Sequence, residues 1–193
     1  MSLIISLLYG SVRRNRQGIK AAKYLGKKLK ERNIDVRFID PLEFKLPFLD
    51  KMYKEFPNGT APKDMETIAN HFRESDAFLV VTGEYNHSLP PALKNLLDHY
   101  QSEYLFKPSA IASYSAGSFG GVRAAVHLRV ILAELGTPTI SSMQPFPAIQ
   151  DLFDDDLVPQ NSQIEKSVDK FLDELIWYAE ALAEKRKNGG TPF

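Results

Sequence analysis

Short apolar segments alternate with longer segments of helical periodicity along this chain, and this rhythm constrains the fold more than any other feature. Residues 3–9 (LIISLLY) and 77–82 (AFLVVT) are apolar with almost no polar alternation, which is typical of strands buried on both faces. Such strands occur in parallel sheets that helices cover on each side. The sequence therefore predicts an α/β fold around a parallel sheet.

Five strands and five helices are expected in alternation. The strands are predicted over residues 3–9, 36–39, 77–82, 109–114 and 137–141. The helices are predicted over residues 14–31 and 62–75, from Ser88 onward, and over residues 119–135 and 161–187. Long loops are expected over residues 41–62 and 144–159. With right-handed crossovers, this element count predicts a flavodoxin-like three-layer α/β/α sandwich whose five-stranded parallel sheet has the order 2-1-3-4-5.

Length and composition favour one domain and exclude several classes of function. The 193 residues suit a single domain over residues 1–193, with residues 185–193 expected as a frayed tail. The 24 Lys+Arg balance 24 Asp+Glu, which argues against a nucleic-acid partner bound through a broad basic field. The absence of cysteine excludes thiolate metal sites and cysteine nucleophiles. No apolar run approaches the ~18–20 residues of a membrane span, so we expect a cytoplasmic protein with no membrane contact.

The loop after the first strand has the composition of an anion site. It reads GSVRRNRQG over residues 10–18. Ser11 and Asn15 offer short hydrogen-bonding side chains, and three arginines offer charge-assisted donors. The loop opens a helix, where amides favour an anion and cations are unfavourable unless an anion offsets them. This pattern indicates phosphate binding, with a solvated basic loop as the alternative; Walker A and GxGxxG patterns are absent.

Two more unusual loops follow the third and fourth strands. Residues 83–98 (GEYNHSLPPALKNLLD) can present consecutive backbone amides beside the aromatic Tyr85, and the alternative is an ordinary strand-to-helix turn. Residues 115–124 (SAGSFGGVRA) contain three glycines, which let backbone approach a ligand, and the alternative is a flexible loop. Ligands of such folds bind outside the carboxyl ends of the strands where the strand order reverses. A crevice between these loops is therefore predicted.

Together these segments resemble a known family. GSVRRNRQG, GEYNHSLPPALKNLLD and SYSAGSFGGVRAA are similar to the GSxRxxR, PEYNxSxPxxLKNxxD and GxxGGxR signatures of the NADPH-dependent FMN reductase family of flavodoxin-like proteins. The resemblance runs from residue 3 to about residue 142. Gly83 stands where the family usually has proline, so weaker preorganisation is expected there. The resemblance implies FMN as cofactor and NADPH or NADH as hydride donor.

The resemblance also implies roles for individual residues. The FMN phosphate would be held by Ser11, Arg13, Asn15, Arg16 and Gln17. The isoalloxazine would be lined, mostly through backbone amides, by Glu84, Tyr85 and Asn86. The neighbouring loop would approach the flavin through Ser115, Gly117, Gly120 and Gly121. A structural role, or a role in assembly as a homodimer or homotetramer, is implied for Lys94, Asn95 and Asp98. The long loops over residues 44–60 and 144–160 are expected to frame the pocket.

The implied function is an FMN-dependent NAD(P)H oxidoreductase. It would transfer two electrons by a ping-pong cycle through flavin N5 to quinones, azo compounds, free flavin or similar small acceptors. No catalytic side chain is expected, because the flavin carries the chemistry. No metal site is expected, since the four histidines lack HExxH spacing and residues 154–156 lack an EF-hand pattern; His87 could touch a substrate. A flavodoxin-type electron carrier and an FMN-binding redox-sensing module stay open as alternatives.

Overall fold

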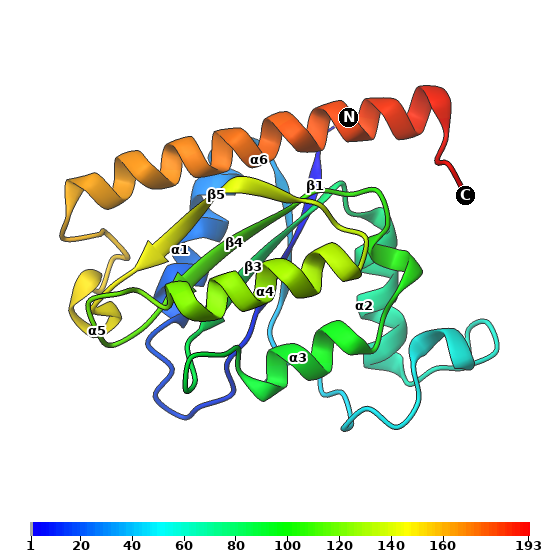
Figure 1. Cartoon of the computed structure of the whole chain (residues 1–193), viewed down its shortest axis with the longest axis horizontal. Helices are drawn as coiled ribbons and strands as arrows, with labels where there is room; N and C mark the ends of the chain where they lie inside the picture. The colour runs from blue at the N-terminus through cyan, green and yellow to red at the C-terminus, as the bar shows by residue number, and fades with distance from the viewer. Residues whose placement is uncertain (1) are drawn as a thin grey trace.

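The structure, a computed structural model that describes residues 2–193, has a sheet between two layers of helices (Figure 1). The five parallel strands have the order β2-β1-β3-β4-β5. Their bounds are β1 (Ile4–Tyr9), β2 (Asp35–Ile39), β3 (Ala77–Gly83), β4 (Ser109–Tyr114) and β5 (Thr139–Phe146). The predicted flavodoxin-like sheet and its strand order are therefore confirmed.

The helices divide between the two faces of the sheet. One face is covered by α1 (Ile19–Lys30) and α6 (Ser162–Gly189). The other is covered by α2 (Lys63–Glu74), α3 (Pro91–Asp98) and α4 (Val122–Glu134). Short turns of helix complete the chain at Tyr53–Glu55, at Ser102–Tyr104 and at α5 (Ile149–Leu152).

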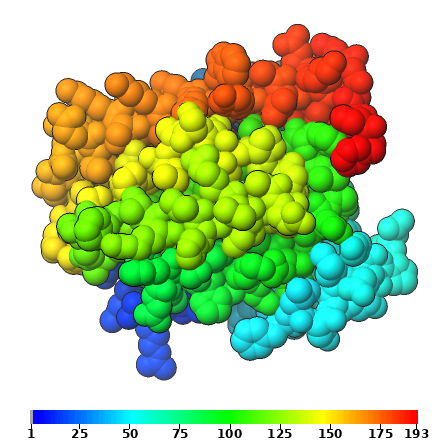
Figure 2. All heavy atoms as spheres, viewed as in Figure 1, coloured from blue at the N-terminus to red at the C-terminus, as the bar shows by residue number. Residues whose placement is uncertain are grey.

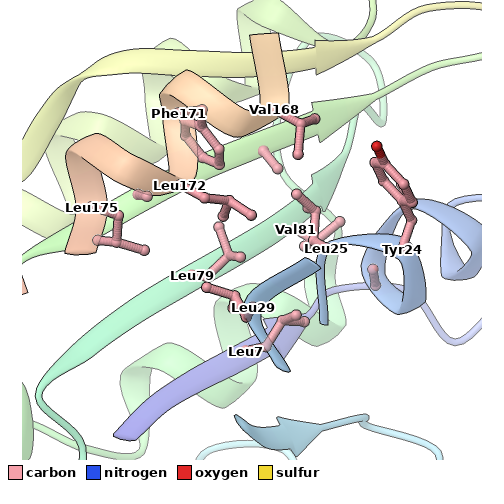
Figure 3. Packing of buried hydrophobic residues seen from close by; sticks show 14 of the residues in the cluster. Leu7, Tyr24, Leu25, Leu29, Leu79, Val81, Val168, Phe171, Leu172 and Leu175 are labelled. Carbon is pink, nitrogen blue, oxygen red and sulfur yellow. The ribbon is translucent and has the colours of Figure 1, made fainter. Parts of the chain in front are cut away.

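Successive residues of the central strands build two separate cores. Leu7 and Leu79 pack with Leu25 of α1 and Leu172 of α6 (Figure 3). Their neighbours in sequence point to the opposite face and join the core beneath α2, α3 and α4. Because both faces of these strands are buried, most positions are apolar, and the buried serines that interrupt them are hydrogen-bonded, as Ser6 is to Ser75 and Ser113 to the carbonyl of Gly120.

Several element boundaries differ from the sequence prediction. Residues 14–18 form turns, so α1 begins at Ile19 rather than at residue 14. The N-cap of α3 is Pro90 rather than Ser88, and no side chain caps the start of this helix. The edge strand β5 extends to Phe146 after a register shift against β4. The sequence prediction ends this strand at residue 141, because Ser142, Gln144 and Pro145 beyond it resemble a loop.

The end of the chain also differs from expectation. Residues 185–189, expected to be frayed, continue α6 to Gly189. Arg186 explains this, because its guanidinium donates to the carbonyl of Phe106 at 2.9 Å and pairs with Asp76 at 3.0 Å. In the space-filling view the helix lies along the upper edge of the molecule (Figure 2), while the loop at residues 10–18 projects from the lower edge.

Candidate functional site

A cavity of about 400 Å³ lies at the carboxyl ends of β1, β3 and β4. This is the place where the strand order reverses, since the chain passes from β1 to one neighbour, β2, and then to the other, β3. Four segments meet there: the loops after β1, β3 and β4, and the segment around α5. The cavity is lined by Ser11, Arg13, Asn15, Arg16, Gln17, Gly83, Glu84, Tyr85, Tyr114, Ser115, Ala116, Ile149 and Gln150.

Most of the side chains singled out in the sequence meet in this cavity. Those that line it are Ser11, Arg13, Asn15, Arg16, Gln17, Glu84, Tyr85 and Ser115. Those that lie outside its lining are Asn86, Gly117, Gly120 and Gly121. Sequence reasoning missed Tyr114, which looks like one more apolar strand residue. It also missed Ile149 and Gln150, which belong to the loop that was expected to frame the pocket.

Arg16 holds the first loop in place. Its guanidinium forms a bidentate pair with Asp40 at 2.5 and 2.6 Å and donates to the carbonyl of Ser11 at 3.0 Å. The two paired side chains are only 17% and 3% exposed. The hydrogen bond that Arg16 donates to Asp40 raises the pKa of Arg16. Because a carboxylate already compensates its charge, Arg16 mainly ties this loop to the end of β2.

Arg13 is the unpaired cation of this loop that lines the cavity. It is exposed, lines the cavity, and takes part in none of the ion pairs among residues 2–193. Its backbone amide donates to the Ser11 hydroxyl at 3.3 Å, and that hydroxyl lies 3.1 Å from the hydroxyl of Tyr85. The loops after β1 and β3 are thus joined by hydroxyl groups beside an unpaired guanidinium.

The loop after β3 contains a tight two-residue turn. The backbone amide of Tyr85 donates to the carbonyl of Ser88 at 2.8 Å, and the amide of Ser88 donates back at 3.0 Å. Between them Asn86 and His87 have φ of 49° and 66°, as a type I′ turn requires. Asn86 therefore shapes the turn, in a backbone conformation that asparagine tolerates well.

Two glycines of the loop after β4 serve close packing inside the protein. Gly120 and Gly121 have φ of 62° and 79°, and a Cβ on Gly121 would lie 2.7 Å from the carbonyl oxygen of Tyr114. Gly117, in contrast, has open space around it. The loop is anchored at its other side, where the amide of Ile149 donates to the carbonyl of Ser115 at 3.1 Å.

Tyr114 lines the cavity, and the buried Tyr9 lies behind it. The hydroxyl of Tyr114 donates to that of Tyr9 at 3.3 Å, and burial raises the pKa of both groups. They are therefore neutral hydroxyls at neutral pH. The ring of Tyr114 lies directly against Gly18, where a Cβ would approach it to 2.1 Å.

The segment at residues 44–60 does not frame this cavity, contrary to expectation. Phe44 and Phe48 instead line a separate apolar groove of about 250 Å³ along α3. The reason is Asn95 of α3, whose side-chain amide donates to the carbonyl of Pro47 at 2.8 Å and accepts from the amide of Leu49 at 3.0 Å. These bonds hold the segment against the helix.

Residues 2–193 contain neither a cluster of metal ligands nor a helix suited to a membrane. Within this range, no three His, Asp or Glu side chains gather closely enough to hold a metal ion. None of the helices in the described part of the chain has the length and apolar character needed to cross a bilayer.

Comparison with known proteins agrees with the geometry. The profile of the family described as NADPH-dependent FMN reductase matches residues 3–148. This chain belongs to that family. A 2-hydroxy-1,4-benzoquinone reductase of Burkholderia sp is 31% identical over 144 residues, which cover 70% of this chain and 73% of that protein. A quinone reductase of Pseudomonas putida is 29% identical over 148 residues, covering 74% and 76%.

Solved structures of related proteins extend the comparison for this member of the NADPH-dependent FMN reductase family. FerB, an NAD(P)H:(acceptor) oxidoreductase from Paracoccus denitrificans, superposes with a TM-score of 0.76 at 25% identity, covering 93% of this chain and 98% of that chain. A flavodoxin from Pseudomonas aeruginosa has a TM-score of 0.56 at 19% identity over 90% and 99% of the chains, which shows the fold alone. The chain is thus an oxidoreductase of the FMN and quinone reductase kind.

Proposed function

We propose that this protein is an FMN-dependent NAD(P)H oxidoreductase that passes two electrons to quinones or similar small acceptors. The observation that carries the proposal is the cavity, which gathers the three motif-bearing loops from distant parts of the sequence. Its volume of about 400 Å³ lies within the ~300–1,000 Å³ typical of small-molecule sites. The quinone reductases among the relatives support the choice of acceptor.

The residues of the cavity fit FMN in their chemistry. From the loop after β1, Ser11, Asn15 and Gln17 offer neutral donors and Arg13 a free guanidinium, a donor set suited to a phosphate. The lining also includes the loops after β3 and β4 and the apolar Ile149, which suit a flat heterocycle. Bound FMN would supply the two-electron chemistry that these side chains lack.

The protein's own contribution is binding and orientation. Arg16 and Asp40 tie the phosphate loop to the end of β2, and the Tyr114 ring packs against Gly18 at the end of the same loop. The neutral hydroxyls of Tyr9 and Tyr114 add no charge there. No proton-transfer residue is assigned.

Hydride uptake from a nicotinamide is the step that separates the proposal from its alternatives. FMN-loaded protein is mixed with NADPH without oxygen, and the visible flavin absorbance is followed. We expect prompt bleaching, and return of the colour when a benzoquinone is added. A spectrum that stayed oxidised with FMN bound would contradict the reductase and favour an electron carrier or a redox sensor.

The phosphate loop makes its own quantitative prediction. Arg13→Ala is expected to weaken FMN binding about 10- to 100-fold, because a charge-assisted hydrogen bond contributes about 1.5–3 kcal/mol. Riboflavin, which lacks the phosphate, should bind the variant and the parent equally well. Arg14→Ala is the matched control, since Arg14 is exposed in the same loop but does not line the cavity. Equal loss in both variants would contradict a specific role for Arg13.

We further propose that the protein forms a homodimer through the face of the sheet covered by α3, which carries Lys94, Asn95 and Asp98, and by α4. Val126 and Val130 are 53% and 70% exposed there, and residues four apart share one face of a helix. Val130→Asp is expected to shift the sedimentation coefficient to that of a monomer. Val158→Asp, at another exposed valine, should leave assembly unchanged.

A further inference from the structure

The carboxylate of Glu84 bonds to the start of α4 rather than to its own loop after β3. It follows β3 directly, yet its Oε2 accepts hydrogen bonds from the backbone amides of Arg123 and Ala124, at the start of α4, at 3.1 and 3.4 Å. Its Oε1 lies 3.5 Å from the Arg123 guanidinium, and its side chain is only 12% exposed. The carboxylate is therefore held by two backbone amides and a cation.

The start of α4 needs such a group. Its N-cap is Gly121, which has no side chain to accept from the helix amides, and its first turn contains no acidic residue. The first amides of a helix lack partners within the helix, and the helix dipole makes a negative charge favourable there. Glu84 satisfies both requirements from a distant part of the sequence.

The backbone of Glu84 is anchored as well. Its amide donates to the carbonyl of Tyr114 at 3.3 Å, which continues the pairing of β3 with β4. One residue thus joins the end of β3, the end of β4 and the start of α4. These are the points from which two of the three loops around the cavity depart.

We propose that Glu84 is a positioning residue with two effects on the flavin site. Its carboxylate locks the loops after β3 and β4 to each other, and its charge offsets the positive end of α4, which lowers the reduction potential of bound FMN. The proposal rests on the FMN-binding function proposed above. It also explains why the anion site of the cavity is the loop after β1, since the N-terminus of α4 is already filled by the protein's own carboxylate.

The electrostatic effect has a definite sign. Reduction adds negative charge to a flavin, and a carboxylate in the lining of the same cavity opposes this. Glu84→Gln removes the charge and keeps an oxygen that can accept from the helix amides. We expect reduced FMN to gain about tenfold in affinity relative to oxidised FMN, which is about 30 mV in the two-electron midpoint potential.

Three variants separate the two effects. Glu84→Ala removes both the carboxylate and its hydrogen bonds, whereas Glu84→Gln removes only the charge. Glu134→Gln is the matched control, because Glu134 is an exposed carboxylate at the opposite end of the same helix. For each variant the apoprotein's unfolding midpoint, the Kd for FMN by fluorescence quenching and the midpoint potential by anaerobic titration are measured.

Glu84→Ala is expected to lower the unfolding midpoint of the apoprotein and to weaken FMN binding about tenfold. Glu84→Gln is expected to keep most of both properties and to raise the potential, and Glu134→Gln to change none of them. An unchanged potential in Glu84→Gln would overturn the electrostatic role, and an unchanged Kd in Glu84→Ala would overturn the lock. A parent protein that failed to bind FMN would overturn the proposed function, and the apoprotein's unfolding midpoint would still report on the lock.

Discussion

At the scale of single residues, the buried pair of Arg16 and Asp40 organises the mouth of the cavity. Arg16→Ala would leave the Asp40 carboxylate, only 3% exposed, without its partner. We expect a loss of about 3–5 kcal/mol in the free energy of unfolding, as is typical when one member of a buried ion pair is removed. Urea unfolding measures it. The double variant Arg16→Met with Asp40→Leu should recover much of the loss, and a double variant as unstable as Arg16→Ala would contradict this account.

Gly18 illustrates how close packing under the cavity constrains one position. A Cβ there would lie 2.1 Å from the ring of Tyr114, so Gly18→Ala must displace the ring or the loop. We expect a cost of about 1–3 kcal/mol, the usual range for overpacking, together with weaker FMN binding. Gly117→Ala, where nothing lies within 4 Å, should show no such cost in thermal unfolding.

At the scale of elements, the last turns of α6 contribute to stability rather than forming a loose tail. Arg186 bonds the carbonyl of Phe106 and the carboxylate of Asp76, and so ties α6 to the amino-terminal side of the sheet. A chain ending at residue 184 should lose about 1–3 kcal/mol in unfolding free energy through these charged hydrogen bonds. A chain ending at residue 190 retains them and should unfold like the parent; equal stability of the two truncations would show that Arg186 contributes nothing.

At the scale of the whole molecule, the carboxyl and amino ends of the strands have different roles. The cavity lies at the carboxyl ends of the strands, while buried charged groups at the amino ends stabilise the fold. There Lys107 is 8% exposed and donates to the carbonyls of Phe72 and Arg73, at 2.5 and 3.0 Å, at the end of α2. Desolvation lowers the pKa of Lys107 to about 8.

This lowered pKa makes the stability depend on pH. Between about pH 8 and the ordinary lysine value near 10.4, the unfolded chain binds the proton more tightly than the folded one. The contribution of Lys107 to stability therefore rises with pH through that window, and it is smallest below pH 8. From pH 7 to 9.5 the parent should gain about 1–2 kcal/mol over Lys107→Met. Lys45→Met, at an exposed lysine, should follow the parent, and parallel curves for Lys107→Met would contradict the assignment.

The sequence by itself determined the layers, the strand order and the loops that carry the site. This was possible because burial of a strand on both faces leaves a local signature, an uninterrupted apolar run, as in residues 77–82. The loops after β1, β3 and β4 were also recognisable from local sequence, because each motif is contiguous. Edge strand β5 was recognised only to residue 141, because Gln144 and Pro145 in its second half resemble a loop.

Only the tertiary structure decided which residues act on one another. It paired Arg16 with Asp40, set Glu84 on the start of α4, placed Tyr114 in the lining of the cavity, and held the segment at residues 44–60 against α3 instead of beside the cavity. Local periodicity reports whether a side chain is buried but not which distant group it meets. Those contacts depend on how the loops fold across the carboxyl ends of the strands, where charged groups and helix amides form hydrogen bonds with distant residues.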